Sequence, residues 1–305
     1  MPSCDRVVFD RPDLPQLIKD HTVVDLHFHS NHSDGLNNIS KIADRARKLG
    51  IGIAVTDHNE IRGALEMDTY EDVLSIPGIE ITAAEGSHLL VYFYDTQELQ
   101  RFYDGVVAPH MGHGVMSSLS LAMEQVIEHA RSYECVIIFA HPYCAMYTGV
   151  CNIQFSKNEL DRLFNMVDGV EVINASNLNK WNLKCSVLGF NLNKAMTGGS
   201  DGHSLGQMGR AVTYVACPPN RRDFLDAVRS KHNLVAGKEI HLLRKMTSNG
   251  LKLRSNINNC PDLMEKHFRY SCKVLNSKSK SFRSNVRRTL NQHLNGTTLG
   301  SYFGI

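Results

Sequence analysis

Residues 22–55 read TVVDLHFHSNHSDGLNNISKIADRARKLGIGIAV, and this stretch has the pattern of a strand, a helix and a second strand. Residues 22–27 are mostly apolar and β-branched, as expected of a strand. Residues 39–49 place apolar side chains on one helical face, with Asn38 as the N-cap and Gly50 as the C-terminal stop. Residues 51–55 then form the second strand. This order is typical of parallel strands covered by helices.

The same alternation of apolar runs and helix-period segments continues along the chain. Further strands are expected at residues 79–81, 89–94, 136–139, 170–173, 195–197 and 212–215. Helices are expected around residues 119–131, 157–165, 179–189 and 220–230. The sequence therefore predicts an α/β fold with most of its strands parallel.

Histidines and acids follow these strands in small groups. They are Asp25, His27, His29 and Asp34, then Asp57 and His58, Glu80, His88, His141, and finally Asp201 and His203. Because active sites of α/β folds assemble at the carboxyl ends of the strands, these side chains are expected to meet. His27 and His29, two residues apart, point to the same side of an extended strand. Imidazole and carboxylate are ligands of divalent metals, and the set exceeds what one ion needs, so the sequence predicts a multinuclear metal site.

Two acids of this series have a different interpretation. Asp57 stands beside His58, and Asp25 stands two residues before His27. We expect both to orient imidazoles rather than to bind metal. For Asp25, a hydrogen-bond acceptor at the end of the strand is an equal alternative.

The order of these motifs resembles the PHP (polymerase and histidinol phosphatase) superfamily over roughly residues 20–237. The matching pieces are HxH followed by Ser-Asp-Gly at 33–35, Thr-Asp-His at 56–58, Gly-Ile-Glu at 78–80, a histidine before an apolar strand, Ala-His-Pro at 140–142 and Gly-Ser-Asp-Gly-His at 199–203. The chain is most similar to the stand-alone PHP phosphoesterases. The supporting runs are residues 169–174, 182–184 and 198–210.

The resemblance implies a distorted (β/α)7 barrel with two or three divalent ions, Mn, Fe or Zn, at its mouth. Matched motif by motif, His27, His29, Glu80 and Asp201 would hold one ion. Glu80, His88 and His141 would hold a second, and Asp34, His58 and His203 a third. The implied activity is hydrolysis of a phosphate ester, with Glu80, Asp201 and His203 at the reacting centre.

The ligands themselves suggest the mechanism, because divalent ions can lower the pKa of a bound water and clamp a phosphoryl group. Hydroxide activated in this way needs no protein nucleophile, and the sequence has no GxSxG elbow. We expect the substrate to be a small phosphorylated molecule, with a nucleotide or short oligonucleotide favoured. The alternatives are an exonuclease that trims DNA or RNA ends and a histidinol-phosphatase-like phosphomonoesterase. A metal-stabilised module without turnover would not need the complete ligand set.

Substrate contacts are less well marked in the sequence. Arg210, seven residues after His203, suits bidentate binding of a phosphate, although a surface salt bridge is the other interpretation. Tyr143 either stacks on a base or sugar or packs locally. Lys180, Lys184 and Asn174 are weaker candidates for phosphate contacts. His110 and His113 lie in residues 95–134, a segment without a motif that is either a lid or a plain surface loop.

Charge divides the chain into two parts. Residues 238–305 hold thirteen Lys/Arg and three Asp/Glu, whereas the rest holds twenty against twenty-eight. We expect residues 20–237 to form the metal-dependent barrel and residues 238–305 a basic, mostly helical extension packed on it. The extension either contacts nucleic acid or an anionic substrate, or is a solvated helix docked on the acidic body.

The remaining composition is that of an ordinary globular protein. The eight cysteines include no CxxC pair, so buried reduced thiols are expected. No apolar run approaches a membrane span, and the amino terminus lacks the features of a secretory signal. We therefore expect a cytoplasmic protein that does not act at a membrane. The oligomeric state cannot be derived from the sequence.

Overall fold

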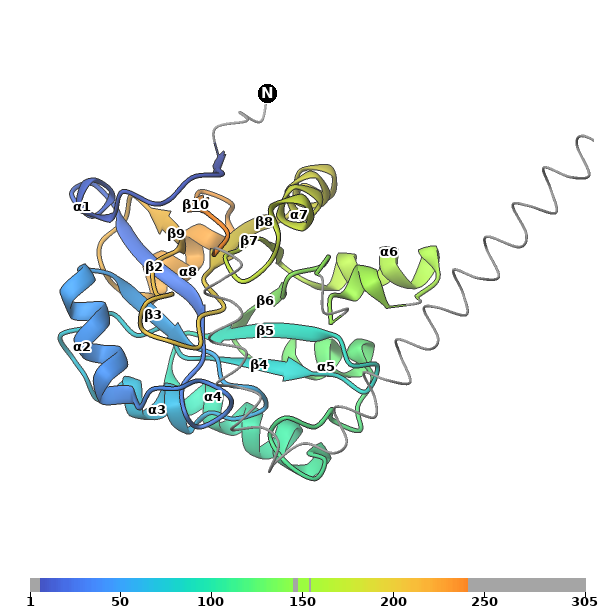
Figure 1. Cartoon of the computed structure of the whole chain (residues 1–305). Helices are drawn as coiled ribbons and strands as arrows, with labels where there is room; N and C mark the ends of the chain where they lie inside the picture. Colours follow the sequence, from blue (N-terminus) through green and yellow to red (C-terminus); the bar gives the residue numbers. More distant parts are fainter. Residues whose placement is uncertain (1–5, 145–147, 154, 241–305) are drawn as a thin grey trace, which may run out of the picture. The chain divides into compact units, whose positions relative to one another are not determined.

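The computed structural model describes residues 6–144, 148–153 and 155–240, and its strands form two sheets (Figure 1). One sheet has the strand order β1-β10-β9-β2-β3 and the other β4-β5-β6-β7-β8. Its strands are β1 (Val7–Val8), β2 (Thr22–Phe28), β3 (Gly52–Val55), β4 (Gly78–Thr82), β5 (His88–Phe93), β6 (Cys135–Phe139), β7 (Gly169–Asn174), β8 (Ala195–Gly199), β9 (Ala211–Val215) and β10 (Leu234–Gly237).

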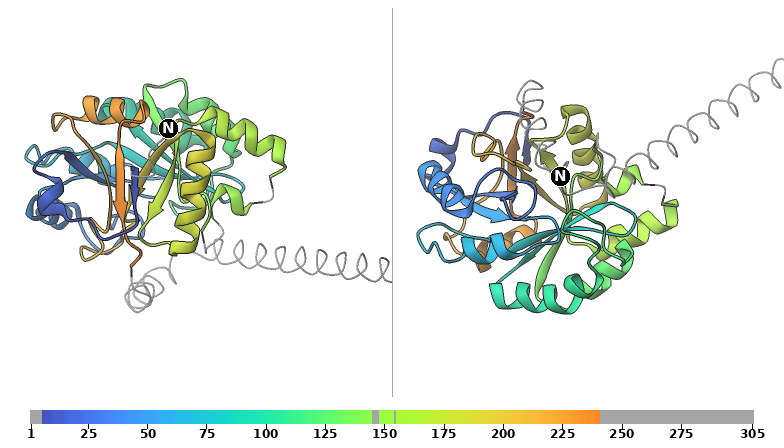
Figure 2. Two further views of the ribbon diagram at one scale, coloured as in Figure 1. Left: turned by 90° about the horizontal axis from the view of Figure 1, so that it is seen from above. Right: turned by 60° about the horizontal axis from the view of Figure 1, so that its bottom comes forward.

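The helices lie around the outside of these sheets (Figures 1 and 2). They are α1 (Leu14–Leu17), α2 (Ile39–Leu49), α3 (Arg62–Met67), α4 (Thr96–Phe102), α5 (Met123–Ala130), α6 (Lys157–Met166), α7 (Asn179–Leu192) and α8 (Arg221–Arg229). Short helical turns are η2 (Tyr103–Val107), η3 (Ala108–His110) and η4 (Val150–Asn152). The strands and helices predicted up to residue 230 are confirmed, with ends that shift by a few residues. Among the described residues, no helix is long and apolar enough to cross a membrane.

The predicted ends of α2 are also confirmed. The Asn38 side chain accepts a hydrogen bond from the Lys41 amide, and Gly50 ends the helix in the left-handed conformation at φ 67°. The apolar face of α2 is buried at Ile39, Ile42, Ala43 and Ala46. These residues pack on the outer face of the first sheet, next to Val23 and Phe28.

The expectation of a (β/α)7 barrel needs correction, because the sheets do not close into one continuous barrel in the described part of the chain. β4 and β5 pair antiparallel, and so do β5 and β6, β2 and β9, and β9 and β10. The five residues 83–87 that join β4 to β5 are too few for a crossover helix, which explains the antiparallel hairpin. The α/β class is confirmed.

Isolated bridges connect the two sheets at two places. They join His58 to Glu80 between β3 and β4, and Phe28 to Gly202 between β2 and the end of β8. Apolar side chains fill the space between the sheets, with Val24 and Leu26 of β2 in the same cluster as Leu90 of β5. These bridges therefore bring the carboxyl ends of β2, β3, β4 and β8 to one place.

The expected basic extension starts at residue 238, and only residues 238–240 lie within the described chain. The Asn179 amide donates to Glu239 Oε2 at 2.6 Å, and the Ile240 amide donates to the Ala175 carbonyl at 2.8 Å. The rest of the extension, including its predicted helices, lies outside the described residues. Among the described cysteines, Cys135, Cys144, Cys151, Cys185 and Cys217 are all free thiols.

Candidate metal centre

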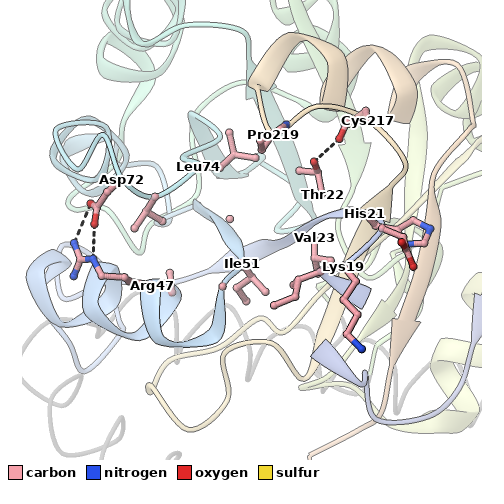
Figure 3. Close-up of a pocket in the computed structure, with 16 residues that line it drawn as sticks. Lys19, His21, Thr22, Val23, Arg47, Ile51, Asp72, Leu74, Cys217 and Pro219 are labelled. Carbon is pink, nitrogen blue, oxygen red and sulfur yellow. Dashed lines mark hydrogen bonds and ion pairs between the residues drawn. The ribbon is translucent and has the colours of Figure 1, made fainter. Parts of the chain in front are cut away.

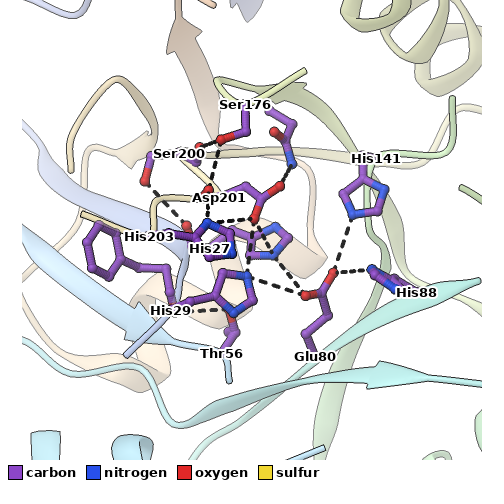
Figure 4. A network of polar contacts seen from close by, with 12 residues as sticks. His27, His29, Thr56, Glu80, His88, His141, Ser176, Ser200, Asp201 and His203 are labelled. Atoms are coloured by element: carbon purple, nitrogen blue, oxygen red, sulfur yellow. Dashed lines mark hydrogen bonds and ion pairs between the residues drawn. The ribbon is translucent and has the colours of Figure 1, made fainter. Parts of the chain in front are cut away.

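The structure brings the predicted histidines and acids together at the carboxyl ends of the strands (Figure 4). His27 and His29 come from the end of β2, Glu80 from β4, and Asp201 and His203 from the loop after β8. His88 begins β5, yet it lies at the same edge because β5 runs antiparallel to β4, with His88 opposite Thr82. The antiparallel β4–β5 hairpin, which differs from the predicted topology, thus places His88 at the predicted site.

Glu80 lies at the centre of this cluster, and its side chain is only 1% exposed. Its Oε1 is 2.9 Å from His88 Nδ1 and 3.3 Å from His141 Nε2. Its Oε2 is 3.1 Å from His58 Nδ1 and 3.4 Å from both His27 Nε2 and His29 Nε2. One carboxylate therefore faces five imidazoles.

Asp201 and Asp34 occupy the other side of His29. Asp201 Oδ1 lies 3.1 Å from His29 Nε2 and 3.7 Å from His27 Nε2. Asp34 Oδ2 lies 3.0 Å from His203 Nε2, and its Oδ1 lies 3.7 Å from His29 Nδ1. His29 is therefore shared by the two aspartates.

Four groups of side chains have ligand atoms within 4.8 Å of one another and could hold a metal ion: His27, His29 and Asp201; His29, Asp34 and His203; His29, His58 and Glu80; and Glu80, His88 and His141. The last group is the set expected for the second ion. The set expected for the first ion is divided between two groups that share His29. His58, expected beside Asp34 and His203, groups with Glu80 and has its Nε2 4.0 Å from Asp34 Oδ1.

The residues present fit a cluster of divalent ions. His27 Nε2, His29 Nδ1 and Glu80 Oε2 are buried and form no hydrogen bond within the described structure. Leaving a buried polar atom unsatisfied costs about 1–3 kcal/mol, so such atoms call for a ligand. Imidazole nitrogen and carboxylate oxygen suit Mn, Fe and Zn alike.

The pKa values within the cluster are shifted in both directions. Burial alone would raise the pKa of Glu80, but the imidazoles of His58, His88 and His27 outweigh it and hold that pKa well below its usual value. Burial lowers the pKa of His58 to about 3. Glu80 is therefore ionised and His58 neutral near pH 7, whereas nearby carboxylates outweigh burial and raise the pKa of His27 and His29, and Cys144 and Glu80 do the same for His141, so metal binding there would displace protons.

Glu171 is a site residue that the sequence analysis did not identify. It lies in β7, is 1% exposed, and places Oε1 2.9 Å from His27 Nδ1. Its Oε2 accepts hydrogen bonds from the His141 amide and from Asn174 Nδ2. A carboxylate on the far nitrogen of a ligand histidine fixes the tautomer and the ring orientation. The sequence could have indicated it, because Glu171 is a single acid inside the apolar run 170–173. A carboxylate buried in a strand needs polar partners, so such an acid points to a site.

The role expected for Asp57 needs correction, and of the two alternatives for Asp25 the structure agrees with the strand-end acceptor, because the described hydrogen bonds of both carboxylates go to groups other than imidazoles. Asp57 accepts from the amide and hydroxyl of Ser30 and from the hydroxyl of Ser33. Asp25 accepts from the amides of Ser200 and Gly209, which is the strand-end alternative. Both acids hold the loops that carry ligands rather than the imidazoles themselves.

The candidates for substrate contacts, Arg210 and the weaker Asn174, Lys180 and Lys184, lie in different parts of the structure. Asn174 Nδ2 donates to Glu171 and Asp201, so it supports the cluster. Arg210 is half-buried, and its Nε donates to the Gly206 carbonyl at 3.5 Å. The ammonium groups of Lys180 and Lys184 lie over the Trp181 ring.

Residues 95–134 include α4, η2, η3 and α5, and one part of this segment is tied to the cluster. Asn59, the residue after His58, donates through Nδ2 to the carbonyls of Val115 and Ser117 at 2.9 and 2.8 Å. His110 Nδ1 lies 2.8 Å from the Val106 carbonyl, within its own turn. Residues 115–117 therefore lie beside the cluster, whereas the described contact of His110 is local.

A cavity of about 500 Å³ lies at the opposite ends of β2 and β3, away from the cluster of histidines and acids (Figure 3). Its walls include the first residues of both strands, Thr22 and Gly52, together with Arg47 and Asp72. Arg47 Nε and Nη2 bind the two oxygens of Asp72 at 2.5 and 3.0 Å. This cavity has no convergent set of metal ligands among the described residues.

Comparison with known protein families identifies two matching regions. A model of the PHP domain matches residues 25–143, and a model of a PHP-associated region matches residues 190–232. An uncharacterized protein of Methanocaldococcus jannaschii is 28% identical over 167 residues, which cover 50% of this chain and 81% of that protein.

Solved structures with the same fold have low sequence identity. A two-domain protein from Bacteroides vulgatus that contains a predicted PHP-like metal-dependent phosphoesterase is 20% identical, with a TM-score of 0.53 over 80% of this chain and 74% of that one. A lesion-specific endonuclease from Pyrococcus furiosus is 16% identical, with a TM-score of 0.57 over 70% of this chain and 57% of that one. At these identities the likeness shows the fold alone.

Proposed function

From the PHP domain at residues 25–143 and the PHP-associated region at residues 190–232, we propose that this chain is a phosphoesterase that hydrolyses a small phosphate ester with two or three divalent ions, Mn, Fe or Zn. We further propose that the substrate is a nucleotide or a short oligonucleotide. The single observation that carries the proposal is Glu80, a buried carboxylate surrounded by five imidazoles.

The proposed ligands follow from the groups of side chains that converge. Glu80, His88 and His141 hold one ion, His27, His29 and Asp201 a second, and Asp34 and His203, with His29 or His58, a third. When bound, such ions supply Lewis-acid activation of water and neutralise phosphoryl charge. Glu80 has one oxygen towards His88 and His141 and the other towards His27 and His29, so it can join two of the ion positions.

Other parts of the chain complete the proposed enzyme. Residues 20–237 are its catalytic unit. We assign Arg210 to the phosphate of the substrate, because a guanidinium binds phosphate oxygens in pairs. Residues 95–134 form a wall or lid of the mouth, which the bonds from Asn59 to Val115 and Ser117 support.

The test is elemental analysis of the purified full-length chain, followed by assay of a manganese-loaded sample. The panel contains nucleoside monophosphates, short oligonucleotides, histidinol phosphate and an aryl phosphate. We expect phosphate release from nucleotides, and its loss after treatment with a chelator. A fully occupied protein that releases phosphate from none of these substrates would exclude the proposal.

A nuclease is the second candidate, and the position of residues 238–240 favours it. These residues lie beside Ala175 and Asn179, directly after β7, and the following 65 residues of sequence are strongly basic. The Pyrococcus relative is an endonuclease. Such an extension would contact the phosphates of a nucleic acid, and binding would then weaken as salt rises.

This candidate is tested in the full-length chain by changing Arg283, Arg287 and Arg288 to Gln. For a nuclease, the affinity of the variant for oligonucleotides falls. The slope of log affinity against log salt concentration also becomes shallower, by about 0.7–0.9 for each phosphate that the variant no longer neutralises. Hydrolysis of a mononucleotide stays unchanged, because the altered residues would contact only the longer substrate. Unchanged oligonucleotide binding would dismiss the extension's role.

A further inference from the structure

Two aromatic side chains lie close to the metal centre and are held there by polar contacts. Tyr143 follows the ligand candidate His141 by two residues, and Trp181 lies in the first turn of α7. The Tyr143 carbonyl accepts from Asn177 Nδ2 at 2.7 Å, and the Tyr143 amide donates to Cys185 Sγ at 3.3 Å. The loops after β6 and β7 are thereby fastened to each other.

A second set of bonds connects this pair to the metal centre. Asn182, the neighbour of Trp181, accepts from the Asn174 amide and donates to the Asn174 carbonyl at 3.2 and 2.9 Å. The Asn174 side chain in turn donates to Asp201 Oδ2 at 3.2 Å. Trp181 is thus connected to Asp201 of the cluster through its neighbour Asn182 and through Asn174.

The two rings are arranged as a stacking surface. Their centroids are 6.4 Å apart, and their planes differ by 11°. Both side chains are half-buried, and neither belongs to a hydrophobic core cluster of the described residues. The buried rings of the core are instead tilted or edge-on, as in Phe93 against Phe102 at 39°. Trp181 is also the chain's single tryptophan.

Positive charge accompanies these rings. The ammonium of Lys184 lies 4.6 Å from the centroid of Trp181 and 5.6 Å from that of Tyr143. The ammonium of Lys180 lies 5.3 Å from the centroid of Trp181. Within the described chain, neither lysine pairs with a carboxylate, so both charges are available to an anionic ligand.

We infer that Trp181, Tyr143 and Lys184 bind the base of a nucleotide whose phosphate lies at the metal centre. This inference rests on the proposed phosphoesterase function and adds the recognition of its leaving group. Aromatic side chains stack on any nucleobase, and a neighbouring cation adds attraction for the base and its phosphate. The ligand class is thus a nucleoside monophosphate or the terminal nucleotide of an oligonucleotide.

The first test uses the fluorescence of Trp181 in the full-length, manganese-loaded protein. Adenosine monophosphate is expected to quench it, whereas ribose 5-phosphate and inorganic phosphate, which have no base, leave it unchanged. Since no other tryptophan contributes, the signal reports this site alone. Equal responses to adenosine monophosphate and ribose 5-phosphate would overturn the inference.

The second test compares KM values for the same two phosphate esters. Trp181→Ala is expected to raise KM for adenosine monophosphate about tenfold or more, because stacking on one ring is lost. KM for ribose 5-phosphate stays as in the wild type, which also shows that the variant is folded. Trp181→Phe restores much of the affinity. Leu183→Ala, two residues away and exposed, is the matched control and changes neither KM.

The outcomes separate this inference from the proposed function. Base-dependent quenching without any hydrolysis supports the stacking site and contradicts the phosphoesterase proposal. Hydrolysis with equal KM values for both esters, unaffected by Trp181→Ala, supports the phosphoesterase and overturns the stacking site.

Discussion

The two ends of the strands differ in how their polar groups are satisfied. At the carboxyl ends, buried imidazoles and carboxylates face one another, and atoms such as His27 Nε2 and Glu80 Oε2 form no hydrogen bond in the described structure. At the amino ends, Arg47 in the wall of the 500 Å³ cavity pairs with Asp72, and among the described lining residues His21 Nδ1 is the one buried side-chain atom that forms no hydrogen bond. Thr22 likewise donates to the Cys217 carbonyl at 2.7 Å.

This difference shows that empty volume alone does not locate the chemistry of this protein. A binding site needs groups whose interactions are incomplete until the ligand arrives. Buried, unsatisfied ligand atoms are costly, so their concentration at one end indicates what that end is built to hold. The cavity at the other end has space, but Arg47 and Asp72 in its wall already neutralise each other. Variants at the metal end should therefore lower activity, whereas variants at the other end should change stability alone.

The largest effect is expected for Glu80→Gln. The amide keeps the size of the side chain but loses the charge that faces five imidazoles, so the metal content should fall. Catalytic efficiency should drop by more than about 100-fold, beyond the range for residues that only orient ligands. Elemental analysis and kcat/KM measure both. Glu128→Gln, an exposed change on α5, serves as the control, and unchanged metal content in Glu80→Gln would contradict the assigned site.

Glu171→Gln should have the next largest effect. The amide can no longer act as a charged acceptor for His27 Nδ1, so His27 is less firmly held in its metal-binding form. A loss of about 10–100-fold in metal affinity or activity is expected. The matched control is Glu66→Gln, because Glu66 also contacts a histidine, His32, at 3.3 Å but is 46% exposed. Equal effects of the two variants would show that Glu171 has no special role.

The sequence predicted that these histidines and acids would meet, because the relevant signals are local. Apolar runs marked the strands, and the period of two placed His27 and His29 on the same side. Their rings are 5.1 Å apart in the structure. Convergence of strand ends is a general property of α/β folds, so the order of strands sufficed to predict that distant residues meet.

The sequence did not predict which side chains would be the hydrogen-bond partners of each carboxylate. Neighbouring residues of an extended chain point to opposite sides, so Asp57 faces Ser30 while His58 faces Glu80. The imidazole partner comes instead from Glu171, which is 144 positions from His27. Contacts of that range depend on how the sheets pack. The antiparallel β4–β5 hairpin is different, because the short loop with Gly86 was visible in the sequence.

Gly199→Ala tests the close approach of strands that builds the metal end. A Cβ on Gly199 would overlap the Cβ of His27 and lie 2.7 Å from its amide nitrogen. We expect the free energy of unfolding to fall by about 1–3 kcal/mol, as for other overpacked sites, together with lower activity. Urea denaturation measures the change. Gly206→Ala is the control, since a Cβ there meets nothing within 4 Å, and an equal loss in both variants would refute the packing argument.

The smallest effect is expected at the amino ends of the strands, where Thr22→Val removes the hydroxyl that donates to the Cys217 carbonyl. Valine has nearly the same shape, so the loss is that of one part-buried hydrogen bond, about 1 kcal/mol of unfolding free energy. Metal content and kcat/KM should equal those of the wild type, because the cavity is separate from the ligand cluster. A fall in activity like that of Glu171→Gln, without a matching loss of stability, would mean that the two ends are coupled. The paired charges around the cavity would then have to be regarded as part of a second functional site.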